Sequence, residues 1–119
     1  RCRWVEGFRP PEEAATAFET ADVVLLTYSR SFVSASSVLG TAAHFRKPCL
    51  ASSGGGHLKE TVEKYGLGLF VEPDNLSALQ RGLDLLRERP PAPRWDDYFR
   101  ENSWETNARI VRDRMFEAV

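Results

Sequence analysis

Short apolar runs alternate with longer amphipathic segments along this chain of 119 residues. The run from Val23 to Tyr28 shows no polar alternation, which is typical of a strand buried on both faces of a parallel sheet. Similar short runs predict further strands at 4–8, 49–52 and 69–71. Apolar residues recur at three- and four-residue steps in segments near 11–21, 35–45, 57–65, 76–86 and 104–115, which predicts helices. The alternation predicts an α/β fold with a parallel sheet of about four strands flanked by helices and joined by right-handed crossovers.

Residues that favour helix ends support these boundaries. Pro11 suits a first helical turn, and Asp22 is expected to close that helix. Gly66 is well placed as a left-handed C-terminal cap. Asp74 or Asn75, and later Ser103, precede apolar helical patterns and predict N-terminal caps.

The proline-rich stretch 89–93 divides the chain into two unequal parts. Its prolines exclude regular structure and predict a stiff extended connector. We therefore expect a partial nucleotide-binding domain over 1–88. The remainder, 89–119, is expected to hold the connector, a helical turn at 95–99 and a last helix. That helix would pack back on the domain or toward another domain outside these residues.

Composition narrows the possible functions. The 16 Lys and Arg balance the 17 Asp and Glu, which argues against a dedicated nucleic-acid or anionic-membrane surface. The presence of only two cysteines argues against a disulfide framework or a thiolate metal site, and a reducing, cytoplasmic compartment fits. No apolar run approaches the ~20 residues of a transmembrane helix, so we expect no transmembrane segment.

Two loops carry the candidate chemistry, because both follow strands at the edge where α/β sheets bind ligands. The first, 29–37, offers backbone N–H groups and the hydroxyls of Ser34, Ser36 and Ser37. The second, 52–57, offers Gly55 and Gly56, whose backbone can approach a ligand closely. This combination suits a diphosphate. The alternative interpretation is that the serines only cap a helix and the glycines only form a flexible turn.

Several segments, taken in their order along the chain, resemble a family of enzymes. The segment from Phe8 to Leu83 resembles the second half of the C-terminal, Rossmann-like domain of GT-B fold glycosyltransferases, most closely glycosyltransferase family 4. The resemblance is carried by Gly7-Phe8, Pro11-Glu12-Glu13, Ala21-Asp22-Val23-Val24-Leu25-Leu26, Ala42-Ala43, Arg46-Lys47-Pro48-Cys49-Leu50-Ala51-Ser52, Gly55-Gly56, Glu60-Thr61-Val62 and Gly68-Leu69-Phe70-Val71-Glu72-Pro73-Asp74.

The resemblance implies transfer of a sugar from a nucleotide-sugar donor to an acceptor hydroxyl, with no bound metal or other cofactor. A helix N-terminus would stabilise the departing diphosphate. The donor-binding residues that it implies, together with those chosen from the loops, are Phe8, Arg9, Arg30, Ser34, Ser36, Ser37, Val38, Thr41, Gly55, Gly56 and His57. The acceptor, a glycan or a lipid-linked molecule, would bind a separate N-terminal domain, and peripheral membrane attachment is an open alternative.

The sequence also departs from the family pattern. Val33 and Thr41 occupy the positions of two family glutamates, so the catalytic residues stay unassigned. The family's basic pair and its upstream strands are not present in these residues. We therefore expect weak donor binding, no transfer by these residues alone, and sheet edges open to pairing. A non-catalytic binding or assembly module and a GT-B nucleotide-sugar epimerase remain as alternatives.

Single residues have structural alternatives as well. His57 is either a phosphate contact or an exposed residue of a first helical turn. Arg30 either pairs with a diphosphate or is solvated. His44 and Cys49 are expected to be structural residues, since nothing near Cys49 in sequence would lower its pKa.

Overall fold

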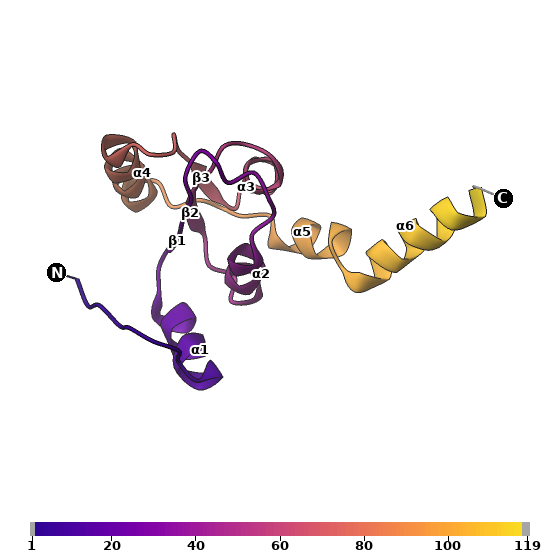
Figure 1. Ribbon diagram of the computed structural model, residues 1–119, viewed down its shortest axis with the longest axis horizontal. Coiled ribbons are helices and arrows are strands. Elements are labelled where there is room, and N and C mark those ends of the chain that lie inside the picture. The colour runs from indigo at the N-terminus through magenta and orange to yellow at the C-terminus, as the bar shows by residue number, and fades with distance from the viewer. Residues whose placement is uncertain (1, 118–119) are drawn as a thin grey trace.

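The computed structural model describes residues 2–117 and shows a mixed α/β fold. Three strands lie in a parallel sheet with helices on both faces (Figure 1). In chain order the elements are α1 (Pro11–Thr20), β1 (Val24–Thr27), α2 (Ser37–His44), β2 (Cys49–Ser52), α3 (His57–Tyr65), β3 (Gly68–Phe70), α4 (Leu76–Glu88), α5 (Trp95–Glu101) and α6 (Trp104–Glu117).

The sheet has the strand order β1-β2-β3, with β2 in the centre and buried along its whole length. Cys49 and Ala51 of β2 face α2 and α3 and join Leu39 and Leu58 in the main core. Leu50 points to the opposite face, where its side chain meets the backbone of α4 at Gly82. Both faces of β2 are therefore covered. The prediction that the run Val23 to Tyr28 is the strand buried on both faces is wrong: β1 lies at the sheet edge and Leu25 is 51% exposed.

The predicted first strand is wrong. Residues 4–8 form no strand, so the described residues hold three strands and not four. Gly7 has φ +83, which interrupts an extended conformation, and Trp4 and Phe8 are 80% and 94% exposed. A strand needs a hydrogen-bonded neighbour, and this segment pairs with no strand among the described residues.

The helix ends follow the local signals closely. Pro11 occupies the first turn of α1, Asn75 Oδ1 accepts the Ala78 N–H at 2.9 Å, and Ser103 Oγ accepts the Thr106 N–H at 3.1 Å. Gly66 caps α3 in the left-handed conformation with φ 61. One boundary differs: α1 ends at Thr20 with Ala21 as its cap, so Asp22 lies outside the helix.

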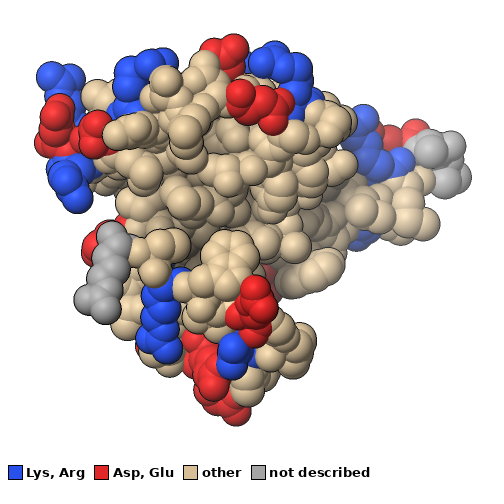
Figure 2. Space-filling model, turned by 60° about the vertical axis from the view of Figure 1, so that its left-hand side comes forward, with Lys and Arg blue, Asp and Glu red and all other residues tan. Residues whose placement is uncertain are grey.

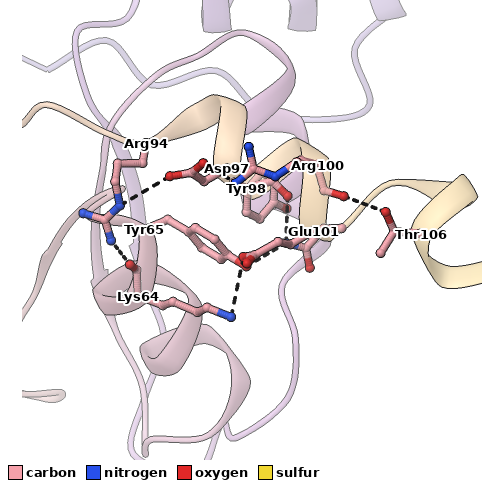
Figure 3. Close-up of polar contacts among 9 residues, drawn as sticks. Lys64, Tyr65, Arg94, Asp97, Tyr98, Arg100, Glu101 and Thr106 are labelled. Atoms are coloured by element: carbon pink, nitrogen blue, oxygen red, sulfur yellow. Dashed lines mark hydrogen bonds and ion pairs between the residues drawn. The ribbon is translucent and has the colours of Figure 1, made fainter. Parts of the chain in front are cut away.

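Segment 89–94 has no regular structure, as the prolines predict. It connects α4 to α5, which begins beside the end of α3, where the Arg94 N–H donates to the Tyr65 carbonyl. Trp95 is 8% exposed and joins the core, while Tyr98 packs edge-on against Tyr65 at 5.5 Å between ring centroids. Figure 3 shows Tyr65 pointing from α3 to Glu101 of α5, to which its hydroxyl donates a hydrogen bond. Lys64 Nζ lies 3.6 Å from the same carboxylate.

Two parts of the chain project from this body. Helix α6 has no buried residue and extends away from the sheet in Figure 1. Helix α1 is also without a buried residue, and Phe18 stacks on Phe45 beyond the end of α2 at 5.5 Å. The radius of gyration is 16.2 Å, against about 13.5 Å for a compact chain of this length. The division of the chain near residue 88 stays a prediction.

Figure 2 shows a face whose middle is covered by uncharged residues, with charged side chains gathered toward its border. Within residues 2–117, none of the helices has both the length and the apolar character needed to cross a membrane.

Candidate functional site

The loops that follow β1 and β2 meet at the carboxyl ends of the strands. The Gly54 N–H donates to the Phe32 carbonyl at 2.8 Å. A Cβ added to Gly54 would lie 1.8 Å from the Arg30 oxygen, and one added to Gly56 would lie 2.4 Å from the Val33 oxygen. The two loops are therefore in backbone contact, and these two glycines are the residues that permit it.

Helix α2 begins beside this contact with Ser36 as its N-terminal cap. Ser36 Oγ accepts the Leu39 N–H at 3.3 Å and lies 2.9 Å from the Tyr28 hydroxyl. Tyr28 is held by stacking on Phe32, with 4.0 Å between ring centroids. Tyr28 thus ties the end of β1 to the start of α2, and the Ser36 hydroxyl is fully used in capping.

The first turn of α2 is the part of the site best suited to an anion. Ser36 uses the amide of Leu39, so the amides of Ser37 and Val38 keep the orphan status of first-turn donors. This turn contains no acidic residue, and Ser37 is exposed while Val38 is 37% exposed. The positive end of the helix dipole is therefore accessible and is not neutralised by a neighbouring carboxylate.

Ser34 and Thr41 are also exposed in this region. Thr41 Oγ1 donates to the Ser37 carbonyl at 3.4 Å, one turn back along α2. This hydrogen bond fixes the orientation of the Thr41 hydroxyl, one helical turn after Ser37.

Helix α3 begins on the other side of the loop contact. Gly56 is its N-terminal cap residue, with φ 79, and no side chain caps the helix. The Gly55 N–H donates to Ser53 Oγ at 3.3 Å, so a hydrogen bond within the glycine loop stabilises its conformation. His57 is exposed, and its Nδ1 lies 3.5 Å from Thr61 Oγ1.

Arg30 is directed away from these helix N-termini. Its backbone N–H donates to Asp74 Oδ2 at 3.0 Å, and its guanidinium lies 3.6 Å from Glu72 Oε1. Both side chains of that ion pair are more than half exposed, so the pair adds little stability, but it directs the arginine toward the loop after β3.

The structure does not bring Phe8 and Arg9 to this site. Phe8 is 94% exposed, and Arg9 contacts Glu13 at 3.7 Å and the Glu6 carbonyl at 2.8 Å. Arg9 lines a groove between the N-terminal segment and α1, and Figure 1 shows that segment leading to α1 below the sheet.

Residues that were not predicted to bind the donor shape the site as well. A cavity of about 360 Å³ opens at the carboxyl ends of the strands and is lined by Thr27, Tyr28, Ser52, Val71, Glu72, Asp74, Asn75, Leu76 and Leu79. Asp74 has φ 57, the left-handed conformation that its Pro-Asp-Asn context favours, and this was the available sequence signal. Gly54 belongs to the predicted glycine loop 52–57, but its contact with the loop after β1 had no local signal, and neither did the bond of Tyr28 to Ser36.

Chemically, the site offers amide donors at the starts of α2 and α3, hydroxyl groups around them, and carboxylates at the far rim of the cavity. Cys49 lies beneath it in the core, where burial raises the pKa of its thiol to about 12 and makes it unreactive. Among residues 2–117, no three His, Cys, Asp or Glu side chains gather into a group that could hold a metal ion. Comparison of the chain with protein-family models, with curated proteins and with solved structures finds no match.

Proposed function

We propose that the carboxyl ends of β1 and β2 bind a nucleotide-sugar, and that the chain is the donor-binding part of a glycosyltransferase acting on an acceptor hydroxyl. The observation that carries the proposal is the exposed, acid-free N-terminus of α2. It is held beside the uncapped start of α3 by the contact of the two loops. Two helix N-termini at one sheet edge suit a diphosphate.

The diphosphate would accept hydrogen bonds from the Ser37 and Val38 amides at the start of α2. In a transferase the leaving nucleoside diphosphate gains negative charge as the sugar departs. Fixed amide donors and the helix dipole stabilise that charge without reorganising. The hydroxyls of Ser34 and Ser37 lie on exposed residues near the same helix start and suit further contacts to phosphate oxygens.

The cavity next to the helix start suits the hydroxyl-bearing parts of the same ligand. Tyr28 borders the cavity and also bonds to Ser36, so the two regions adjoin. Glu72 and Asp74 on its rim are hydrogen-bond acceptors, which repel phosphate but bind sugar hydroxyls. The proposal therefore places the charged group of the ligand at α2 and its uncharged hydroxyl groups toward the loop after β3.

A second candidate is a non-catalytic module that binds a nucleotide-sugar or a partner without transferring a sugar. Val33 and Thr41 favour it, since neither supplies a carboxylate beside the start of α2. Val33 lies next to the glycine loop and is 58% exposed, and the Thr41 hydroxyl donates a hydrogen bond to a carbonyl of its own helix. The same lack of a nearby carboxylate disfavours an epimerase, which needs groups that move protons.

The test is thermal unfolding of the protein with UDP-glucose, GDP-mannose and ADP-glucose, followed by a transfer assay. A ligand present at about 100 times its Kd stabilises the folded state by about 2.7 kcal/mol. We expect stabilisation by one of the three. Absence of stabilisation by all of them contradicts the proposal. Because no transfer is expected from these residues alone, the transfer assay uses the full-length protein, in which stabilisation by a donor without transfer to an acceptor favours the non-catalytic module.

The variant Ser37→Pro isolates the contribution of the helix amide. Ser37 is the first residue of α2, where proline is tolerated, and Ser36 already has the extended conformation (φ -106, ψ 121) that precedes proline. Losing one hydrogen bond to a charged group costs about 1.5–3 kcal/mol, so donor affinity should fall roughly ten- to a hundredfold. Ser37→Ala, the control, keeps the amide and should weaken binding less.

A further inference from the structure

Helix α6 carries an apolar stripe with the spacing of a coiled-coil seam. Trp104, Ala108, Val111 and Met115 follow one another at steps of four, three and four residues, the spacing of alternating d and a positions. The stripe is uncovered: Trp104 is 87%, Val111 58% and Met115 66% exposed. A groove of about 640 Å³ runs along it.

The body of the protein does not supply the missing cover. Helix α6 has no buried residue over its 14 residues and extends away from the sheet and from α5 in Figure 1. An isolated helix of this length is marginal in water, because its stability normally comes from packing of its apolar face. The helix therefore requires a partner surface that matches the stripe.

We propose that α6 pairs with α6 of a second copy of this chain, the two helices running antiparallel. In this arrangement the stripe is self-complementary. Trp104 packs against Met115 of the second copy at each end, and Ala108 packs against Val111 of the second copy in the middle. The outer pairs join a sulfur to an aromatic ring, a favourable contact, and the inner pairs join a small residue to a medium-sized one.

The charges beside the stripe select the antiparallel direction. Glu105 and Arg112 each follow a d position, so both flank the same side of the seam. In an antiparallel pair, Glu105 of one helix faces Arg112 of the other, and this happens twice by symmetry. In a parallel pair Arg112 would face Asn107, which has no charge. Arg112 now contacts Asp113 at 3.3 Å, an exposed ion pair that costs little to exchange.

The expected complex is weak. Two helices of 14 residues give a seam of only two heptads, which places the interface at the low end of size, below about 1,200 Å². A dissociation constant on the order of 10–100 µM is the corresponding expectation. None of these α6 residues belongs to the loops at the carboxyl ends of the strands, so the dimer does not depend on the proposed donor binding.

The test measures the oligomeric state by sedimentation velocity from about 10 µM to about 1 mM, a range that brackets the expected constant. The protein should shift from monomer to dimer. Val111→Asp, at the centre of the seam, should abolish the shift. Ile110→Asp, the same change on a residue outside the stripe, should leave it intact. Since α6 contributes no buried residue to the body, both variants should keep the fold.

Charge reversal tests the direction of pairing. Arg112→Glu and Glu105→Arg should each weaken the dimer at least tenfold, and the double variant should restore it. Arg109→Glu, which carries the same charge change away from the seam, should have little effect. A monomer at every concentration overturns the proposal. A dimer that survives Val111→Asp, or one that the double reversal does not restore, overturns it as well.

Discussion

At the scale of single residues, Gly54 and Gly40 are the same amino acid in opposite surroundings. Gly54 lies against the backbone of the loop after β1, so no Cβ fits between it and the Arg30 carbonyl. Gly40 lies inside α2 with open space where a side chain would be. One glycine is required by a close approach of two loops, and the other only lowers the stability of a helix.

The substitution of alanine at each position separates these two roles. Gly54→Ala should destabilise the protein by about 1–3 kcal/mol and part the two loops, because the added Cβ overlaps backbone that cannot yield easily. Gly40→Ala should stabilise it by about 1 kcal/mol, since alanine favours the helix interior. Urea unfolding measures both. A neutral Gly54→Ala variant would show that the loops are not in contact in solution.

Ser36 shows what sequence can and cannot assign at this scale. The sequence predicts that Ser36 binds the donor, with helix capping as the alternative, and the structure shows the capping contact to the Leu39 N–H. Its bond to Tyr28, eight residues earlier, depends on how the end of β1 meets the start of α2. The same holds for Arg30, whose partners Glu72 and Asp74 follow a different strand. Local chemistry was predictable, and contacts between segments were not.

At the scale of elements, the helices were more predictable than the strands. Caps such as Gly66 and Asn75 are local interactions, so their signals lie within a few residues of the helix ends. A strand exists only with a neighbour, and segment 4–8 has the apolar pattern without one. The docking of α5 was equally hidden, because Tyr65 and Glu101 lie 36 residues apart in sequence.

That docking has a pH dependence with a definite sign. The pKa of Glu101 is lowered from its ordinary value of 4.5, first by the hydrogen bond from Tyr65 and then by the charge of Lys64. A carboxylate whose pKa is lower in the folded state stabilises that state above pH 4.5. The contribution is lost as pH falls through the folded pKa.

Urea unfolding at pH 7 and at about pH 3 should reveal this contribution. Glu101→Gln keeps an acceptor for Tyr65 but removes the charge. It should therefore be less stable than the native protein at neutral pH and nearly equal to it in acid. Glu88→Gln, at the exposed end of α4, serves as the control. An unchanged difference between native protein and Glu101→Gln at the two pH values would contradict the assignment.

At the scale of the whole molecule, β1 and β3 form the two edges of the three-stranded sheet. The run Val23 to Tyr28 predicts a strand buried on both faces, yet β1 lies at the edge of the described sheet. Leu25 is 51% exposed, whereas Leu50, its neighbour in register on β2, is fully buried. Pairing of this edge with further strands stays a prediction. The apolar residues of each strand are evident from the sequence, but only the fold shows which strand lies at an edge with exposed side chains.

Donor binding where the two loops meet is the central claim, and amide chemical shifts test it most directly. A two-dimensional ¹⁵N–¹H titration of the protein with each nucleotide-sugar reports every backbone N–H separately. Donor binding as proposed should shift the amides of Ser37 and Val38 and those of segment 54–57, while the amides of α6 stay unchanged. Shifts confined to other parts of the chain, or no saturable shift with any of the three donors, would contradict it.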